Sequence, residues 1–364
     1  MKTSIALHKP VLIIAEAGVN HNGSLAMALQ LVDAARAAGA DVVKFQTFKA
    51  ENLVDAHAPK AVYQYNSAQP DESQLEMLKK LELSPAAHHQ LAEQCRKVGI
   101  KFLSTPFDTA TLAFLVQEMN LPLLKLSSGA ITHGPLLFKA GQSGCDIILS
   151  TGMSTLKEIK QALQILAFAM TENKMAPKLH KIDKYLQSQV GKRGVARRVT
   201  LLHCTSAYPA PADTINLLAM ETLEKTFGLP VGLSDHSAGI AIPIAAVAKG
   251  ARVIEKHLTL DQNLAGPDHR ASLEPEPFKQ MVQAIREVEQ ALGDGRKIPT
   301  PGEIDMAKVA RCSLVALESI QAGERFTEQN LGVKRPGTGI TPIYYWNYLG
   351  NKSKKSYEKG QFIY

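Results

Sequence analysis

The sequence is poor in cysteine, and its four cysteines are scattered. The 364 residues include only Cys95, Cys145, Cys204 and Cys312, and no two of them are spaced as a CxxC pair. This spacing argues against a zinc knuckle and against a disulfide framework. Because cysteines that are not built into disulfides are typical of a reducing compartment, we expect a cytoplasmic protein.

Long apolar runs are also absent. No stretch approaches the roughly 20 residues needed to span a membrane. The N-terminal stretch 1–14 has one early lysine, no long apolar core and no small-residue cleavage site, and its apolar residues run straight into polar ones. This pattern is typical of a first strand rather than a signal peptide, and we expect no membrane partner.

Acidic residues are outnumbered by basic ones, 34 to 41, which gives a formal charge of +7. Such an excess can indicate a nucleic-acid-binding protein. Much of it, however, lies in one segment, Lys174 to Arg198, and no aromatic-rich motif interleaves with that segment. A local basic segment of this kind is more often a solvated insertion than a binding patch, so we expect no nucleic-acid partner.

What the sequence does contain is a repeated unit, in which a short apolar run ends in polar residues and an alanine-rich or leucine-rich stretch follows. Strands are predicted at 11–18, 41–47, 100–107, 122–129, 146–152, 199–206, 230–237 and 251–258. Strands that alternate with helices pair in parallel through right-handed crossovers.

Eight such units within about 260 residues predict a (β/α)8 TIM barrel, whose usual size is about 250 residues. The main alternative is a doubly wound open sheet. That fold normally carries a glycine-rich phosphate loop after its first strand, and VLIIAEAGVNHNGS (11–24) is not such a loop. The sequence therefore predicts an α/β protein whose barrel domain spans 1–290.

The composition of the sequence changes after Gly293. A stretch punctuated by proline and glycine predicts a linker at 291–308, and short segments broken at glycines predict a small β-rich domain at 309–364. A domain of about 55 residues has a thin core, and we expect it to depend on a larger neighbour.

Barrel enzymes build their active sites at the carboxyl ends of several strands. At those ends this sequence carries Glu16, Lys44, Gln46, Thr105, Lys125, Ser128, Ser150, Thr151, His203, Ser234, His236, Glu255 and His257. A single residue of this kind often only caps the backbone, but the whole set predicts a ring at one barrel mouth. Its lysines and hydroxyls indicate a site for phosphate or carboxylate.

Two histidines in this ring predict a metal. His236 and His257 end adjacent strands, with Asp235 and Asp268 nearby in the sequence. A lone histidine is more often structural, whereas two neighbouring imidazoles with open positions suit Mn²⁺, Fe²⁺, Co²⁺ or Zn²⁺. An anion site beside a Lewis acid fits a reaction between an enol phosphate and an aldehyde, in which lysines hold the anion and the metal polarises the aldehyde.

The same segments resemble the sialic acid synthase family. The resemblance runs in order through 13–24, 43–54, 102–108, 148–154, 201–211, 232–237 and 253–275, and the tail at 320–340 is similar to that family's antifreeze-like (SAF) domain. It covers nearly the whole chain. Only the basic segment from about 171 to 198 looks like an insertion, which would lengthen the loop before the sixth strand.

Within the family, residues 58–64, 71–83 and 266–275 are most similar to bacterial N,N'-diacetyllegionaminate synthases. The resemblance implies condensation of phosphoenolpyruvate (PEP) with 2,4-diacetamido-2,4,6-trideoxymannose, giving the nonulosonic acid and phosphate by C–O cleavage. The nearest alternative is an N-acetylneuraminate synthase that uses N-acetylmannosamine. The sequence also fits a related PEP-dependent or aldol-type barrel that acts on another sugar and, more remotely, a non-catalytic carbohydrate- or ice-binding protein.

The resemblance also implies roles for individual residues. His236 and His257 would bind the metal, most often Mn²⁺, with Mg²⁺ or Co²⁺ as alternatives. Lys44, Thr105, Lys125, Ser128, Ser150 and Ser234 would hold PEP, and Glu16, Gln46, Tyr208 and Asp268 would approach the sugar. Arg335 would reach the active site of a partner subunit, which implies a domain-swapped homodimer. Glu16, Lys44, Lys125, His236 and Glu255 form the expected catalytic group.

Two positions depart from the family pattern. The family typically reads SGE after the fourth strand, whereas this sequence reads Ser128-Gly129-Ala130. Because losing a general acid or base typically costs about 10²–10⁴-fold in rate, either Glu16 or Glu255 replaces that glutamate or the enzyme is slow or altered. Ser206-Ala207 replaces a bulkier polar pair and is expected to reshape the sugar pocket.

Overall fold

The computed structural model describes residues 10–60, 72–172 and 179–364. It divides into two compact units, with the boundary between Gly293 and Asp294. Parts of the motif 58–64 and of the expected insertion 171–198 lie outside the described residues, as does residue 71 of the motif 71–83.

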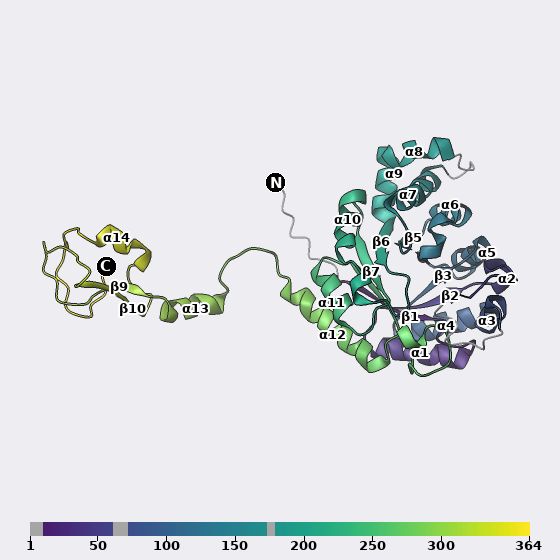
Figure 1. Ribbon diagram of the computed structural model, residues 1–364, viewed down its shortest axis with the longest axis horizontal. Coiled ribbons are helices and arrows are strands. Elements are labelled where there is room, and N and C mark those ends of the chain that lie inside the picture. Colours follow the sequence, from purple (N-terminus) through teal and green to yellow (C-terminus); the bar gives the residue numbers. More distant parts are fainter. Residues whose placement is uncertain (1–9, 61–71, 173–178) are drawn as a thin grey trace. The chain divides into compact units, whose positions relative to one another are not determined.

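Eight parallel strands form the centre of the first unit (Figure 1). They are β1 (Leu12–Gly18), β2 (Val42–Thr47), β3 (Lys101–Pro106), β4 (Leu123–Leu126), β5 (Asp146–Ser150), β6 (Val199–Cys204), β7 (Val231–Asp235) and β8 (Val253–His257). Their order is β3-β2-β1-β8-β7-β6-β5-β4, and β3 also contacts β4. The predicted TIM barrel is confirmed, since each predicted strand range contains one of these strands.

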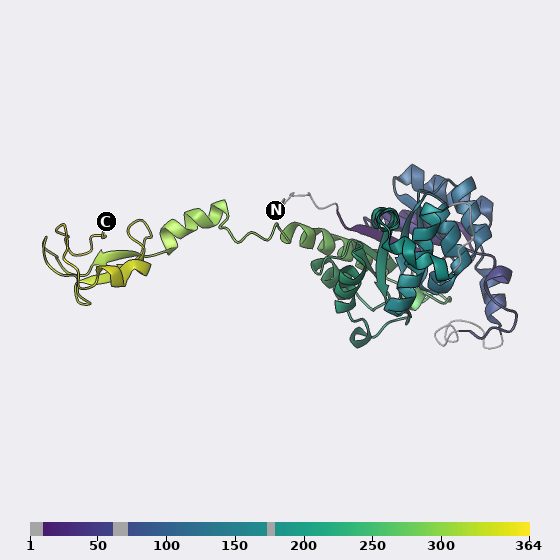
Figure 2. The same cartoon turned by 90° about the horizontal axis from the view of Figure 1, so that it is seen from above.

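Helices cover the outside of this barrel (Figures 1 and 2). The longer ones are α1 (Leu25–Ala37), α4 (Pro85–Val98), α6 (Gly134–Gln142), α7 (Leu156–Thr171), α10 (Leu218–Phe227), α11 (Ala241–Ala248) and α12 (Pro275–Ala291), and a short helix, α5 (Thr109–Ala113), follows β3. Their starts follow local rules: in α7, for example, Thr155 and Glu158 form a capping box.

Two short helices follow β2 before the chain reaches α4. They are α2 (Ala50–Leu53) and α3 (Gln74–Lys80), and they pack against each other. The Ser73 side chain caps α3 by accepting a hydrogen bond from the Glu76 backbone. This excursion carries side chains that take part in the cavity described below.

Strand alternation divides the barrel's apolar residues into two cores. One set, which includes Ile13, Val43 and Leu149, packs outward against the helices. The other set faces the barrel interior and consists of Ile14, Val42, Leu103, Ile148, Leu202 and Val253. Successive strand residues point to opposite faces, so the next interior positions along each strand lie above this second core.

The described part of the segment that was expected to lengthen the loop before the sixth strand is helical, so the expectation of a loop is wrong there. Helices α8 (Leu179–Gln187) and α9 (Gln189–Arg198) both pack against α7. Tyr185 meets Phe168 of α7 edge to face at 4.8 Å, and Ser188 caps α9. The buried side chains of Ile182 and Val195, together with this cap, support the pair of helices, and most of the charged side chains described in this segment are exposed.

The second unit is the small C-terminal SAF domain with a two-stranded sheet. Strands β9 (Ser313–Ala316) and β10 (Leu331–Lys334) pair antiparallel over a core that includes Phe326, Tyr357 and Ile363. A short helix, α14 (Tyr345–Tyr348), contributes partly buried tyrosines. Residues 301–310, most of which fall in the predicted linker, form helix α13 (Pro301–Ala310), started by a capping box between Thr300 and Glu303.

None of the helices in the described ranges is both long enough and apolar enough to cross a bilayer.

Candidate active site

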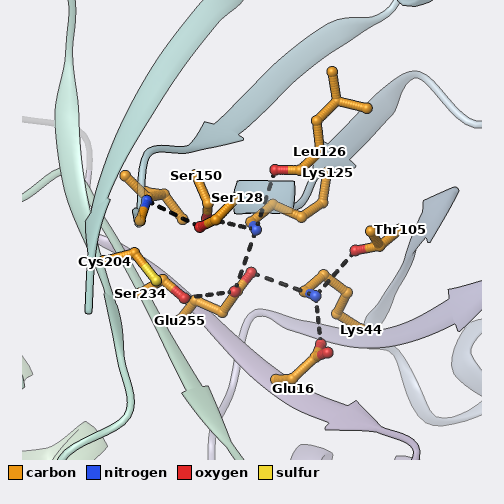
Figure 3. Close-up of polar contacts among 12 residues, drawn as sticks. Glu16, Lys44, Thr105, Lys125, Leu126, Ser128, Ser150, Cys204, Ser234 and Glu255 are labelled. Atoms are coloured by element: carbon orange, nitrogen blue, oxygen red, sulfur yellow. Dashed lines mark hydrogen bonds and ion pairs between the residues drawn. The ribbon is translucent and has the colours of Figure 1, made fainter. Parts of the chain in front are cut away.

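The polar residues at the strand ends stand directly above the interior core of the barrel. Two residues after Ile14 comes Glu16, two after Val42 comes Lys44, and the same step leads from Val253 to Glu255. Because this spacing keeps a side chain on the same face of a strand, the strands that build the apolar core also aim charged groups into the mouth. Figure 3 shows these groups converging.

A cavity of about 450 Å³ opens at this mouth. It is lined by the predicted residues Glu16, Lys44, Gln46, Thr105, Lys125, Ser128, Ser150, Tyr208, Ser234, His236, Glu255, His257 and Asp268. The structure therefore brings these predicted site residues of the first unit together in one cavity. Arg335 belongs to the second unit, where it is exposed just after β10.

Two residues of the predicted ring do not line this cavity. Thr151 and His203 line a neighbouring pocket instead. The Thr151 hydroxyl donates to the Leu202 carbonyl, and His203 bonds the Ile215 carbonyl at 2.6 Å. His203 lies one residue away from the inward-facing positions of β6, so the alternation of the strand turns it outward.

Two buried lysines and two buried glutamates form a connected charge network (Figure 3). Lys44 Nζ lies 2.6 Å from Glu16 Oε2 and 3.6 Å from Glu255 Oε2. Lys125 Nζ lies 3.4 Å from Glu255 Oε1. Both lysines therefore carry counter-charges inside the protein.

Hydroxyl groups complete the surroundings of the lysines. Thr105 accepts a hydrogen bond from Lys44 at 3.1 Å, and Ser150 accepts one from Lys125 at 2.7 Å. Ser234 donates to Glu255 at 2.9 Å, and Ser128 accepts from the Gly152 amide at 3.0 Å. Ammonium groups flanked by hydroxyls suit the oxygens of phosphate and carboxylate.

The two predicted metal ligands lie side by side. The ring centroids of His236 and His257 are 5.3 Å apart, and the Tyr208 ring lies 4.1 Å from that of His236. His236 Nδ1 donates to the Thr205 carbonyl at 2.7 Å, which leaves Nε2 as the acceptor nitrogen. His257 Nδ1 is buried without a hydrogen bond, 3.7 Å from Asp268 Oδ2.

These residues fit a divalent cation with two histidine ligands and open positions. A carbonyl that orients one imidazole is a common support for a metal ligand. Burial lowers the pKa of His257 well below its usual range, which keeps that ring neutral as metal binding requires. Within the described residues, however, no cluster of three His, Cys, Asp or Glu side chains is arranged to hold a metal.

Burial and neighbouring charges shift the pKa values of Glu16 and Glu255 in opposite directions. Burial raises the pKa of Glu16 to about 7, with Glu255 adding to the shift and Lys44 opposing it. Burial also acts to raise the pKa of Glu255, but Lys125 and Lys44 overcome it and bring the value to about 2. Near neutral pH, Glu16 can therefore hold or release a proton while Glu255 stays ionised.

Asp268 is a third carboxyl group in the cavity. Burial raises its pKa to about 6. It lies with Glu16 and Gln46 around Gly18, whose φ of +53° is favourable for glycine. A Cβ added at Gly18 would lie 3.1 Å from Glu16 Oε1, so the glycine keeps this corner of the cavity open.

The turn after β4 supplies no carboxylate to the cavity. Ala130 is buried in the 3₁₀ turn Ser128–Thr132, while Ser128 and Gly129 of the same turn line the cavity. The acidic residues that line it are Glu16, Glu255 and Asp268.

Sequence reasoning missed one wall of the cavity and one thiol. The wall is mainly apolar, with Gln74 as a polar member, and comes from residues around α2 and α3, which no periodicity placed over the barrel mouth. The thiol is Cys204, whose Sγ lies 3.8 Å from His236 Nδ1. The signal for Cys204 was available, because it stands two residues after the interior Leu202.

The fold and cavity define a TIM-barrel protein whose mouth is lined by lysines, hydroxyls and histidines, together with an SAF unit. The model of the NeuB family matches residues 31–297, and that of the SAF domain matches residues 311–364. The chain therefore belongs to the NeuB family and is a PEP-dependent nonulosonic acid synthase.

Individual relatives agree with this assignment. The chain is 46% identical to the N,N'-diacetyllegionaminic acid synthase of Campylobacter jejuni, over 98% of this chain and 99% of that protein. It is 42% identical to the Legionella pneumophila enzyme of the same name, over 96% and 92%. The crystal structure of the N-acetylneuraminic acid synthetase of Leptospira borgpetersenii in complex with citrate is similar at a TM-score of 0.66, with 33% identity, 82% of this chain and 90% of that chain covered.

Proposed function

We propose that this enzyme condenses PEP with 2,4-diacetamido-2,4,6-trideoxymannose to give N,N'-diacetyllegionaminate and phosphate. One observation carries the proposal: two buried lysines, two imidazoles and the hydroxyls of Thr105, Ser128, Ser150 and Ser234 converge in a single cavity. The identity to two proteins named for this product supports the choice of sugar.

Lys44, Thr105, Lys125, Ser128, Ser150 and Ser234 hold PEP in this proposal. The Lys125 ammonium and the Ser150 hydroxyl are already joined at 2.7 Å, so they present a charge and a hydroxyl to one anionic group together. Holding the enol phosphate beside the aldehyde turns a bimolecular step into one within a complex, which can contribute several orders of magnitude in rate. Gln46, Tyr208 and Asp268 line the part of the cavity assigned to the sugar.

The proposed bond changes balance without an added oxidant or reductant. C3 of PEP forms a bond to the aldehyde carbon of the sugar, whose oxygen takes up a proton and becomes a hydroxyl. Water adds to C2 of the former PEP, and the C2–O bond to phosphate then breaks. The products are the 2-keto acid and inorganic phosphate.

Glu16 is the proposed proton carrier in place of the missing glutamate at position 130. Its pKa of about 7 lets it accept a proton from water and release it within one turnover, whereas Glu255, at about 2, stays charged beside both lysines. Glu16 lines the cavity, so its carboxyl group can contact a bound substrate directly.

His236 and His257 are the proposed ligands of a divalent metal, with Mn²⁺ as the first choice and Mg²⁺ or Co²⁺ as alternatives. Such a metal supplies a Lewis acid that polarises a bound oxygen. The chain's own contribution is to hold the rings: the Thr205 carbonyl bonds the His236 imidazole, and the Tyr208 ring packs against His236 and meets His257 edge to face.

The remaining assignments concern the second unit and the compartment. Arg335, exposed after β10, is proposed to reach the sugar site of a partner in a domain-swapped homodimer. All four cysteines are free, which supports a reducing, cytoplasmic location.

The second candidate is an N-acetylneuraminate synthase that uses N-acetylmannosamine. The similarity to the Leptospira borgpetersenii synthetase favours it, at lower identity than the two legionaminic acid synthases.

The test is phosphate release by purified protein with PEP and either sugar, with Mn²⁺ or with excess chelator. We expect release that requires the metal and is faster with the diacetamido sugar. Faster release with N-acetylmannosamine would favour the second candidate. No release with either sugar, from protein that stays folded, would contradict the proposed substrates.

A further inference from the structure

The turn that follows β1, residues 19–23, lies between two of the segments that line the cavity. On one side it meets the end of α3, where a Cβ added at Gly23 would stand 2.1 Å from the Lys80 carbonyl oxygen. On the other side it is hydrogen-bonded to the segment 258–272, which follows β8. The turn therefore connects parts of the cavity that are far apart along the chain.

Asn20 is the buried link from this turn to the segment 258–272. Its Nδ2 donates to the Leu258 carbonyl at 2.9 Å and to the Ser272 hydroxyl at 2.8 Å. The Ser272 hydroxyl in turn donates to the backbone carbonyl of Asp268 at 2.6 Å. Asn20 and Ser272 are each only 1% exposed, so water competes little for these bonds. Asn20 thus holds the backbone of Asp268 through one intervening hydroxyl.

Asn22 holds the same segment on the other side of Asp268. Its Nδ2 donates to the Ala265 carbonyl at 2.8 Å, and its Oδ1 accepts from His269 Nε2 at 3.2 Å. Gly266 passes close to this pair, since an added Cβ would lie 2.7 Å from Asn22 Oδ1 and 2.6 Å from His269 Cδ2. Glycine at this position therefore lets the segment approach the turn closely enough for Asn22 to bond it.

Asp268 lies between these points of attachment, and its side chain lines the cavity. Its Oδ2 lies 3.7 Å from His257 Nδ1, which makes no hydrogen bond. Because that contact does not fix the direction of the carboxylate, the place of the carboxylate depends on the backbone that carries it. The two asparagines hold that backbone before and after Asp268.

We infer that Asn20 and Asn22 are positioning residues that set the place of Asp268 in the sugar part of the cavity. The inference rests on the proposed function, in which Asp268 approaches the sugar. Neither asparagine is among the residues that line the cavity, so each acts through the segment it holds. A displacement of about 1 Å at a reacting site can cost about 10²-fold in rate.

The first experiment measures steady-state kinetics with Mn²⁺, varying PEP and the diacetamido sugar in turn while the other is saturating. Asn20→Ala removes the buried link. Asn22→Gly removes the second side chain and leaves a residue that readily adopts the φ of +49° found there. Asn120→Gly is the matched control, because Asn120 is exposed, has a φ of +53° and bonds the nearby Glu118 carbonyl.

We expect kcat/KM for the sugar to fall about 10- to 100-fold in Asn20→Ala and Asn22→Gly, with the KM for PEP within about twofold of the wild-type value. The reason is that the proposed PEP ligands Lys44 and Lys125 stand on β2 and β4, which the two asparagines do not bond. Asn120→Gly should match the wild type. A general loss of structure would change the kinetics of both substrates alike, so equal changes in the two KM values would overturn the inference. Unchanged sugar kinetics in folded Asn22→Gly would do the same, even where Asn20→Ala fails to fold.

The second experiment needs no turnover and separates this inference from the proposed function. Crystal structures of the wild type and of Asn22→Gly should differ by about 1 Å or more in the place of the Asp268 carboxylate relative to Glu16. An unmoved carboxylate would overturn the inference whichever sugar is the substrate. Wild-type protein that turns over neither the diacetamido sugar nor N-acetylmannosamine would contradict the proposed function, while a moved carboxylate would still support the positioning of Asp268.

Discussion

Two buried networks of lysines and carboxylates lie on opposite faces of the barrel strands, one facing the cavity and one facing the helices. They differ in how completely their hydrogen-bonding groups are satisfied. On the cavity side, Glu16 Oε2 and Glu255 Oε2 share one ammonium group, Lys44, at 2.6 and 3.6 Å, and His257 Nδ1 is buried without a hydrogen bond. On the helix side, one position along β7 and β8, Lys256 Nζ pairs with Asp235 Oδ2 at 2.6 Å and also bonds the Ser237 carbonyl.

The helix-side pair is complete. Asp235 also accepts hydrogen bonds from the Ser237 amide and hydroxyl, each at 3.0 Å, and Lys256 is fully buried. Because buried charges are costly unless paired and bonded, the fold depends on this network remaining complete, and removing one partner alone is expected to destabilise it. An incomplete one keeps bonding capacity for a ligand. The comparison teaches that buried pairs of a lysine and a carboxylate serve structure or chemistry according to the strand face on which they lie.

The largest effect is expected from a substitution that breaks the helix-side pair of Lys256 and Asp235. Lys256→Met leaves the Asp235 carboxylate buried without its counter-charge and should lower the free energy of unfolding by about 3–5 kcal/mol. Asp235→Leu combined with Lys256→Met should recover a substantial part of that loss, because no buried charge remains. Urea denaturation of the wild type, Lys256→Met and the double variant measures these differences in stability. A double variant no more stable than Lys256→Met would contradict a structural role for this ion pair.

A second change breaks the cavity-side network. Lys125→Met should lower kcat/KM by about 10²–10³-fold, the usual cost of removing one donor to a reacting anion. Stability should be unchanged or higher, since Glu255 keeps Lys44 and Ser234 as partners. Steady-state kinetics and urea denaturation check both, with the exposed Lys225→Met as control. A strongly destabilised Lys125→Met would show that the cavity side also supports the fold.

The smallest effect concerns pH. The folded-state pKa of Glu16, about 7, lies above the usual 4.5, so the folded protein binds more protons between these values. Stability from this group is thus fully present below pH 4.5 and is lost as the pH rises through 7, by at most about 3 kcal/mol. In metal-free protein, Glu16→Gln should flatten the fall of the urea midpoint between pH 4.5 and 7. A slope identical to that of the wild type would exclude Glu16 as its source.

Much of the fold was predictable because it follows from local patterns. Each of the eight strands fell within its predicted range, since β-branched runs ending in polar residues leave few alternatives in an alternating chain. Helices α8 and α9 were not predicted because their sequence is rich in charged residues. The contacts of Tyr185 and Val195 with the barrel core support them as helices. Helix α13 was missed because proline and glycine also occur in the first turn of a helix.

The sequence by itself determined which side chains stand at the strand ends, because the two-residue period of a strand places Lys44 above Val42 and Glu255 above Val253 whatever surrounds them. Only the tertiary structure decided which of these groups meet, that Glu16 and Glu255 acquire opposite pKa shifts, and that α2 and α3 add a mainly apolar wall. The physical reason is that dielectric surroundings and cavity shape are set by residues far apart along the chain, which no local pattern records.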